Sequence, residues 1–308
     1  MYQPAALVKG DKIGIISPAG KINPEKVGIA VTRLEEAGYK VVLGNHVFDV
    51  ENQFAGSDMN RLRDLQLMLD DPEIKAVLCA RGGYGSVRIL EHLDFDLFIR
   101  NPKWIVGYSD ITVFHSYLNN ILGVESIHAT MPVNFPSLKE KEDNSLSTLL
   151  HSLAGDLENY EISSHELNRN GVTEGELIGG NLSILYSLRG TVMDFEPHGK
   201  ILFIEDVGEE LYHLDRMMKN LKMGGKLSEL QGLIIGGMSD MKEGNPDFGK
   251  TAYEIILESI ENYSYPVVFD FPAGHIKENW ALPFGRFLRL DVSKKGAKFT
   301  WDKYKEME

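Results

Sequence analysis

Cysteine is almost absent from this chain of 308 residues, which has only Cys79. A single cysteine excludes a disulfide within the chain and a cysteine-rich metal site. The nine histidines are scattered and no H-E-x-x-H motif occurs, so the ligand set of a zinc enzyme is missing. We therefore expect a protein that uses no metal and no other cofactor.

Membrane and export signals are also lacking. No segment is apolar for long enough to cross a bilayer. Residues 1–16 have no basic segment followed by an apolar stretch and a cleavage site, which is the pattern of a signal peptide. These absences predict a cytoplasmic protein.

Positive charge is in short supply. The 32 Lys and Arg residues against 45 Asp and Glu residues give a net charge of −13. An acidic surface repels phosphate backbones and anionic lipids, so we expect neither nucleic acid nor a membrane as a partner. The hydrophobic share of 43% is that of a soluble protein with a real core, and the length suggests two domains.

The first half of the chain alternates strand-like and helix-like segments. Strands are predicted within residues 11–20, 40–47, 74–86, 103–109 and 124–131, and helices after Asn23-Pro24 and within 58–71, 86–93 and 110–120. This alternation predicts a parallel sheet with right-handed crossovers, here a Rossmann-like domain. Ligands of such sheets bind beyond the carboxyl ends of the strands, which places Gly20, residues 81–85 and Ser109 near one edge.

The second half begins with a change of pattern. Residues from about 135 to 175 are polar and rich in turn-forming residues, which predicts a connection. Strands are then predicted within 199–209, 230–238 and 265–275, a helix within 211–225, and a hairpin within 284–302 that turns at 294–296. We therefore divide the chain into an N-terminal α/β domain, residues 1–145, a linker, residues 146–174, and a mixed α/β C-terminal domain, residues 175–308.

Ser109 is the first candidate for catalysis. It lies in the run Gly107-Tyr108-Ser109-Asp110, between a predicted strand and a predicted helix, which is the setting of a nucleophile elbow. The run lacks the second glycine of G-x-S-x-G. The alternative is a serine that caps the helix, since serine is a favoured N-cap residue.

A serine nucleophile needs a base and a group that orients the base. Among the histidines, His275 stands out because it follows a predicted strand and lies between Gly274 and a polar stretch. Glu205 and Asp206 end an apolar strand, where a carboxylate can reach a cleft. A structural histidine and a carboxylate that caps the next helix are the alternatives.

Two glycine-rich runs are candidates for backbone N–H donors. Gly82, Gly83 and Gly85 could cradle a phosphate or polarise a carbonyl oxygen, but they match neither G-x-G-x-x-G nor G-x-x-x-x-G-K-[ST]. Residues 178–181 are equally ambiguous, and a plain turn is the alternative for both runs.

Six segments in this order resemble the serine LD-carboxypeptidase, or muramoyltetrapeptide carboxypeptidase, family. They are "GDKIGIISPAG", "ARGGYGSVRIL", "KWIVGYSDIT", "EGELIGGNLSIL", "ILFIEDVGEELYHLDRMM" and "FPAGHIKENWALPFG", and they span nearly the whole chain. The family also includes peptidases that give self-immunity to the peptide-nucleotide antibiotic microcin C. The resemblance implies a nucleophile at Ser109, a general base at His275 that Glu205 orients, and an oxyanion hole from the backbone amides of Gly83 and Asp110.

The implied function is release of terminal D-alanine from murein tetrapeptides during cell-wall recycling, with Arg81 and Asn181 as candidates for contacting the peptide. Structural hydrogen bonding is the alternative for Arg81. The pattern leaves open whether the third residue of the peptide is diaminopimelate or lysine. We also expect a homodimer, although no motif sets the oligomeric state.

Two other functions are alternatives. A microcin C-type immunity peptidase, which cleaves an aminoacyl-nucleotide, would need an aromatic platform for the base. Only Trp104, Trp280 and Trp301 are present, and none lies in the polar connection, which favours the murein peptide. The second alternative is a non-catalytic protein that binds an anion or a peptide at the glycine run, with Ser109 capping a helix.

Overall fold

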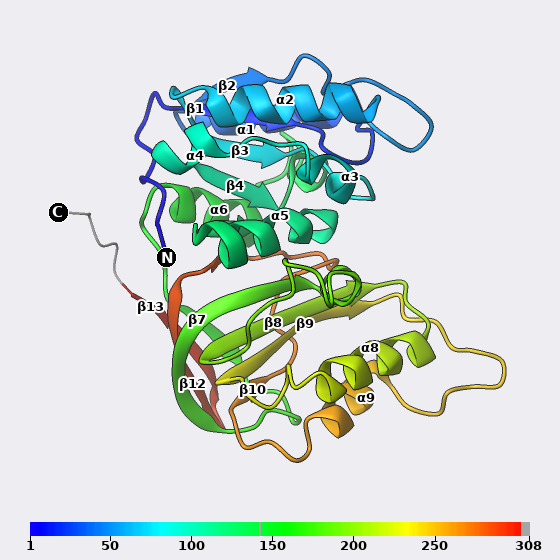
Figure 1. Cartoon of the computed structure of the whole chain (residues 1–308). Helices are drawn as coiled ribbons and strands as arrows, with labels where there is room; N and C mark the ends of the chain where they lie inside the picture. Colours follow the sequence, from blue (N-terminus) through cyan, green and yellow to red (C-terminus); the bar gives the residue numbers. More distant parts are fainter. Residues whose placement is uncertain (142, 303–308) are drawn as a thin grey trace. The chain divides into compact units, whose positions relative to one another are not determined.

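The computed structural model describes residues 1–141 and 143–302. Within them the chain folds into two units (Figure 1). Unit 1 comprises Met1–Leu157 together with Trp280–Pro283, and unit 2 comprises Glu158–Asn279 together with the residues from Phe284 onward. Unit 1 is therefore built from two separate stretches of the sequence.

Unit 1 contains a six-stranded sheet. Its strands are β1 (Lys12–Ile16), β2 (Lys40–Leu43), β3 (Ile74–Cys79), β4 (Trp104–Gly107), β5 (Ser126–His128) and β11 (Leu282–Phe284). The order is β11-β5-β4-β3-β1-β2, and the pairs from β2 through β5 are parallel, which confirms the predicted Rossmann-like sheet. The order reverses between β1 and β3, so the turns after these strands flank the crevice where doubly wound sheets bind ligands.

The helices of unit 1 are α1 (Pro24–Glu36), α2 (Asp58–Asp70), α3 (Ser86–Leu90), α4 (Asp96–Arg100), α5 (Thr112–Tyr117) and α6 (Asn144–Leu153), with the short η1 (Ser109–Ile111), η2 (Leu118–Leu122) and η3 (Pro132–Asn134). Four of these helices, α1, α2, α3 and α5, lie where the sequence predicts them, whereas α4 and α6 were not predicted. The Asn23 side chain accepts a hydrogen bond from the Glu25 N–H, and Pro24 occupies the first helical position of α1. Ser57 caps α2 in the same way, by accepting from the Asn60 N–H.

Strand residues of unit 1 alternate between two helical layers. Ile13 and Ile15 of β1 share a buried cluster with residues of α1 and α6. Gly14, between them, faces α2, where a Cβ atom would lie 2.6 Å from the Met68 sulfur. The sheet is thus covered on both faces, as a buried parallel sheet must be.

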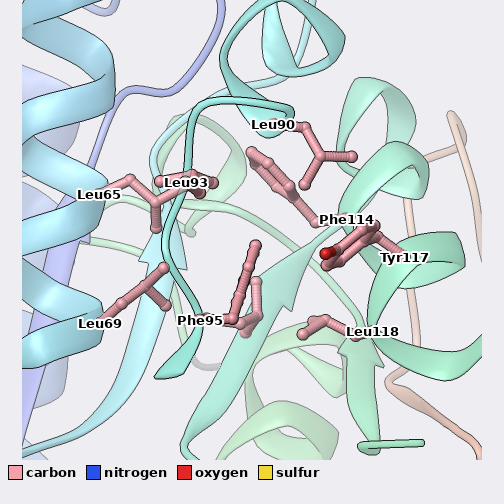
Figure 2. Close-up of a pocket in the computed structure, with 9 residues that line it drawn as sticks. Leu65, Leu69, Leu90, Leu93, Phe95, Phe114, Tyr117 and Leu118 are labelled. Atoms are coloured by element: carbon pink, nitrogen blue, oxygen red, sulfur yellow. The ribbon is translucent and has the colours of Figure 1, made fainter. Parts of the chain in front are cut away.

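The layer that contains α2 and α5 encloses a small apolar cavity (Figure 2). Its volume is about 10 Å³, and it is lined by Leu65, Leu69, Leu90, Leu93, Phe95, Ile105, Phe114, Tyr117 and Leu118. A space of this size fits about one water and offers it no polar partners, so it is a packing defect behind α5 and not a ligand site.

Unit 2 contains a mixed seven-stranded sheet. Its strands are β6 (Tyr160–Ser163), β7 (Gly171–Asn181), β8 (Lys200–Val207), β9 (Gly232–Ser239), β10 (Val267–Val268), β12 (Phe287–Ser293) and β13 (Gly296–Trp301). The order is β10-β9-β8-β7-β12-β13-β6. The pairs from β10 through β7 are parallel, and those from β7 through β6 are antiparallel, which confirms the predicted mixed domain.

Three helices cover one face of this sheet: α7 (Leu182–Ser187), α8 (Leu211–Met223) and α9 (Ala252–Ser259). Leu211, Leu214, Met218 and Leu221 of α8 are buried in one cluster with strand residues of β8 and β9, as their spacing of three and four predicts. The predicted terminal hairpin is also present, since β12 and β13 flank residues 294–295.

The region around the predicted linker, residues 146–174, has more regular structure than its polar sequence suggests. It contains most of α6, all of β6 and the start of β7. Residues 178–181, which could be a plain turn by sequence, continue β7 to Asn181. In the part of the chain that the structure describes, no helix has the length and apolar character needed to span a bilayer.

Candidate active site

Ser109 lies directly after β4 in a conformation that serine rarely adopts. Its φ angle is +65°, in the left-handed region, and the side chain is only partly buried. Such a backbone costs a non-glycine residue about 1–2 kcal/mol and is concentrated at functional sites. Ser109 is not an N-cap residue, because Tyr108 precedes η1 and Ile111 precedes α5. The sharp turn from strand to helix is the geometry of a nucleophile elbow.

A glycine turn, residues 82–86, packs against this elbow. A Cβ atom on Gly82 would lie 2.9 Å from Ser109 Cβ, 3.1 Å from Ser109 Oγ and 3.4 Å from the Asp110 nitrogen. The Gly82 carbonyl accepts a hydrogen bond from the Gly20 N–H at 3.0 Å, which ties the turn after β3 to the turn after β1. Only glycine at position 82 lets the glycine turn approach the Ser109 elbow so closely.

Two backbone N–H groups beside Ser109 are candidates for an oxyanion hole. Gly83 is exposed with φ +109°, and no hydrogen bond within the described residues uses its N–H. The same is true of the Asp110 N–H, at the start of the helical turn that follows Ser109. Two unengaged donors near one hydroxyl can stabilise a developing negative charge on a carbonyl oxygen.

Arg81 precedes the glycine turn and is exposed. Its Nη1 donates to the Lys21 carbonyl at 3.0 Å, so the structural hydrogen bond that the sequence left open is present. An exposed guanidinium keeps further donors for a carboxylate. Its contact with a substrate stays a prediction.

His115, in the helix that follows the elbow, is fully buried and has both ring nitrogens engaged. Nε2 is 2.8 Å from the Gly107 carbonyl and Nδ1 is 2.8 Å from Ser126 Oγ. A carbonyl can only accept, so we assign the proton to Nε2 and a hydrogen bond from the Ser126 hydroxyl to Nδ1. Burial lowers the pKa of His115 to about 4, so it stays neutral and fixes the end of β4 just before Ser109.

In unit 2, Glu205 and His275 form a direct pair. Glu205 lies near the carboxyl end of β8 and is 0% exposed. Its Oε2 accepts from His275 Nδ1 at 2.8 Å and from the His275 backbone N–H at 3.1 Å. The Nδ1 proton is therefore held toward Glu205, which leaves Nε2 as the nitrogen that can accept a proton.

Gly274 allows the histidine to approach the carboxylate so closely. Its φ angle is +110°, and a Cβ atom there would lie 2.7 Å from both Glu205 Cβ and Glu205 Oε2. The carbonyl of His275 accepts from Ser239 Oγ at 2.8 Å, which anchors the segment to the end of β9. Any side chain at position 274 would push His275 away from Glu205.

Asn181 holds the other oxygen of Glu205 and links it to Asp206. Asn181 Nδ2 donates to Glu205 Oε1 at 3.2 Å and to Asp206 Oδ1 at 3.0 Å, while its Oδ1 accepts from Ser183 Oγ and the Ile184 N–H. Two donors on Oδ1 fix the amide orientation. Asn181 is thus placed to position the carboxylate, and its contact with a substrate stays a prediction.

Burial and the neighbouring carboxylates together set the pKa values of Asp206 and His275. Burial, followed by the negative charge of Glu205, raises the pKa of Asp206 to about 7. Burial alone lowers the pKa of His275, but the hydrogen bond and charge of Glu205, with the charge of Asp206, outweigh it and the net direction is upward from 6.5. Asp206 and His115 were not singled out as site residues by the sequence. For Asp206, the one sequence signal was its place beside Glu205 at the end of a predicted strand. For His115 there was none.

The structure therefore assembles two groups of residues. Unit 1 brings Ser109 and Asp110 together with Gly82, the residue before Gly83, and unit 2 brings Glu205, His275 and Asn181 together. Among residues 1–141 and 143–302, no group of three or more His, Cys, Asp or Glu side chains is placed to hold a metal ion.

Both halves of the chain match family models. Residues 13–129 match the LD-carboxypeptidase N-terminal domain, and residues 174–290 match the LD-carboxypeptidase C-terminal domain. A Bacillus subtilis protein named "Probable murein peptide carboxypeptidase" is 35% identical, over 96% of this chain and 93% of its own length. The chain belongs to the LD-carboxypeptidase family.

Other relatives of this LD-carboxypeptidase agree on the fold. The crystal structure of muramoyltetrapeptide carboxypeptidase from Oxalobacter formigenes matches with a TM-score of 0.86 at 29% identity, over 95% of this chain and 99% of that one. The Microcin C7 self-immunity protein MccF of Escherichia coli is 25% identical, over 96% of this chain and 95% of its length. The family resemblance and the α/β fold class predicted from sequence are both confirmed.

Proposed function

We propose that this LD-carboxypeptidase is a serine peptidase that releases terminal D-alanine from murein tetrapeptides, in the cytoplasmic recycling of cell-wall fragments. The observation that carries the proposal is Ser109, held at φ +65° beside the unengaged N–H groups of Gly83 and Asp110. The paired Glu205 and His275 support it, because a serine hydroxyl needs a base with an oriented imidazole. Murein peptides are also the substrates named for two relatives.

The first half of the reaction forms an ester on Ser109. Ser109 Oγ attacks the carbonyl carbon of the bond to D-alanine, while His275 Nε2 accepts the hydroxyl proton. The carbonyl electron pair moves onto oxygen, where the N–H groups of Gly83 and Asp110 donate to it. Collapse of this intermediate breaks the C–N bond, and His275 returns the proton to the leaving amine of D-alanine.

The second half hydrolyses the ester. Water attacks the acyl carbon, His275 takes the water proton, and the same proton returns to Ser109 Oγ as the tripeptide leaves. Glu205 accepts the Nδ1 hydrogen bond throughout and stabilises the imidazolium without taking its proton. The exposed guanidinium of Arg81 is the proposed partner of the substrate's terminal carboxylate.

The stereochemistry of the substrate provides the test. We expect cleavage of L-Ala-D-Glu-diamino acid-D-Ala, and poor cleavage of its terminal L-Ala epimer and of its C-terminal amide. An L centre on the acyl side and a D centre on the leaving side fix where each side chain points, so the wrong epimer loses mainly transition-state binding. Mass spectrometry of the three digests measures this. Equal cleavage of the tetrapeptide and its epimer would contradict the stereochemical account.

A second prediction concerns pH. His275 must be neutral to accept a proton, and its raised pKa moves the acid limb of kcat/KM above 6.5. Glu205→Gln removes the larger of the two carboxylate effects and should move that limb to lower pH, whereas Asp206→Asn should move it less. The measurement is the pH profile of kcat/KM on the tetrapeptide for the three proteins. An acid limb that stays in place in Glu205→Gln would mean that another group titrates there.

Two of the chain's three tryptophans, Trp104 and Trp301, favour the murein peptide over an aminoacyl-nucleotide, while Trp280 is partly exposed. Trp104 and Trp301 are buried, and the Trp104 Nε1–H donates to the Ala5 carbonyl, so neither offers a ring for stacking. The proposal includes a homodimer, which sedimentation of the purified protein measures directly.

A further inference from the structure

The glycine turn, residues 82–86, is held at its second end by two buried charged side chains that the reaction steps do not use. At its end, the Ser86 N–H donates to Asp110 Oδ2 at 2.8 Å, and the Gly85 carbonyl accepts from Arg61 Nη1 at 3.1 Å. Asp110 and Arg61 are each 1% exposed. Gly83, whose N–H faces no partner within the described residues, lies between these anchors and the Gly82–Gly20 bond.

Arg61 connects two turns of the crevice. It lies in α2, and its Nη1 donates to the Pro18 carbonyl at 2.6 Å as well as to Gly85. Pro18 belongs to the turn after β1, and Gly85 to the turn after β3. The contact leaves no room for a side chain, since a Cβ atom on Gly85 would lie 2.5 Å from Arg61 Nη1. One nitrogen therefore fixes the separation of the two turns that flank the crevice.

Burying a guanidinium carries a large desolvation free energy, so stability alone does not explain Arg61. Removing a charge from water costs several kcal/mol, and well-packed apolar residues often serve stability as well as an ion pair. Arg61 recovers the cost through its ion pair with Asp58 and the two carbonyls. An apolar residue could not donate hydrogen bonds to the two backbone carbonyls, and these bonds fix the direction of each carbonyl.

Asp110 links the two proposed oxyanion donors through one residue. Its backbone N–H is one donor, and its carboxylate anchors the turn that carries the other, Gly83. The donor angle at Gly83 is thus coupled to the position of Asp110.

We propose that Arg61 and the Asp110 carboxylate are positioning residues of the oxyanion hole, which hold the glycine turn so that the N–H groups of Gly83 and Asp110 serve one oxyanion. This inference rests on the proposed function. Oxyanion donors act mainly on the transition state, so loosening the turn lowers kcat while leaving ground-state binding in place.

Arg88 provides a matched control for Arg61. Both guanidinium groups pair with Asp58, and both lie over the Phe54 ring, at 5.0 Å for Arg61 and 5.8 Å for Arg88. Arg88 is exposed and donates to no backbone carbonyl of the glycine turn. A change at Arg88 therefore disturbs the shared ion pair and a contact with the Tyr84 side chain, but it removes no hydrogen bond to a backbone carbonyl of the turn.

The test compares Arg61→Gln with Arg88→Gln. For each, kcat and KM are measured on the tetrapeptide, with the Ki of a phosphonate analogue that mimics the tetrahedral intermediate and the Kd of the tripeptide product. In Arg61→Gln we expect kcat and analogue affinity to fall together by about 10²-fold, with KM and tripeptide affinity within about threefold of wild type. In Arg88→Gln all four should stay within about threefold.

Each other outcome counts against the inference. It is overturned by a kcat of Arg61→Gln that equals that of Arg88→Gln, or by a tripeptide affinity that falls as far as the analogue affinity, which would indicate a general distortion. If Arg61→Gln does not fold, Arg61→Lys keeps the charge but replaces the planar guanidinium, which binds Asp58 and the two carbonyls through two nitrogens, with one ammonium nitrogen, and the same two results decide. A wild-type protein without activity on the tetrapeptide overturns the proposed function and this inference together, whereas an active wild type with unaffected Arg61 variants overturns this inference alone.

Discussion

Ser109→Ala should reduce turnover of the murein tetrapeptide by roughly 10³-fold or more. Without Oγ no ester can form, and the residual rate comes from binding and the oxyanion donors alone. The protein should remain folded, because alanine meets the same left-handed backbone that serine already tolerates at φ +65°. Steady-state kinetics on the purified variant give the result. Near-normal turnover would exclude Ser109 as the nucleophile.

Two controls separate catalysis from folding. Ser109→Gly removes both the hydroxyl and the backbone strain, so we expect it to be equally inactive but more stable by about 1 kcal/mol, as a rise in Tm. A fluorophosphonate probe should label wild type at Ser109 and leave Ser109→Ala unlabelled. Absence of labelling in wild type would favour a non-catalytic protein that binds an anion or peptide.

His275→Gln should lower turnover by about 10³-fold as well. The glutamine amide can still donate to Glu205, so the buried carboxylate keeps a partner, but it cannot accept the Ser109 proton. Combining this change with Ser109→Ala should add little, since the two residues act as one unit. Kinetics of the single and double variants measure both effects.

His213 offers the matched control for His275. It forms the same kind of pair, with its Nδ1 2.5 Å from Glu209 Oε2, but it lies on α8. We expect His213→Gln to retain turnover within about threefold of wild type. Equal losses at His213 and His275 would show that the assay reports disturbed packing of unit 2 and not the loss of a base.

The strand-turn-helix at Ser109 was predictable because the apolar run of β4 stops at Gly107 and resumes with helical spacing. The end of β7 was ambiguous because Gly179 and Gly180 suggest a turn. Their real cause is a close approach to β8, since a Cβ atom on Gly179 would lie 1.9 Å from the Phe203 carbonyl oxygen. That cause exists only once the strands are paired.

Helix α6 was missed although its signals were present. Asp143 caps it by accepting from the Leu146 N–H, and Leu146, Leu149 and Leu153 form its buried face. The residues just before α6 are polar and rich in turn formers, and this composition led us to predict a connection that included the helix.

Some residues of the candidate site could also be predicted from the sequence, and others could not. Ser109, Glu205 and His275 could be proposed from sequence because each lies at or just after a predicted strand end. Arg61 could not be proposed in this way, because the carbonyls that it holds, at Pro18 and Gly85, are 43 and 24 residues away. Positioning residues of this kind are defined by topology, and a single sequence contains no local pattern for them.

Unit 1 cannot be completed during synthesis until the segment Trp280–Pro283, which follows most of unit 2 in the sequence, has been made. Ala281 is part of the unit 1 core, its N–H donates to Thr148 Oγ1, and β11 forms an edge of the unit 1 sheet next to β5. At ribosomal speeds, the stretch between Leu157 and this segment takes roughly ten seconds to emerge. Throughout that interval β5 is an open sheet edge, available to any other nascent strand. A gene fragment that ends at Leu157 would keep that edge open permanently, so unit 1 cannot be moved into another protein by a single cut in the sequence.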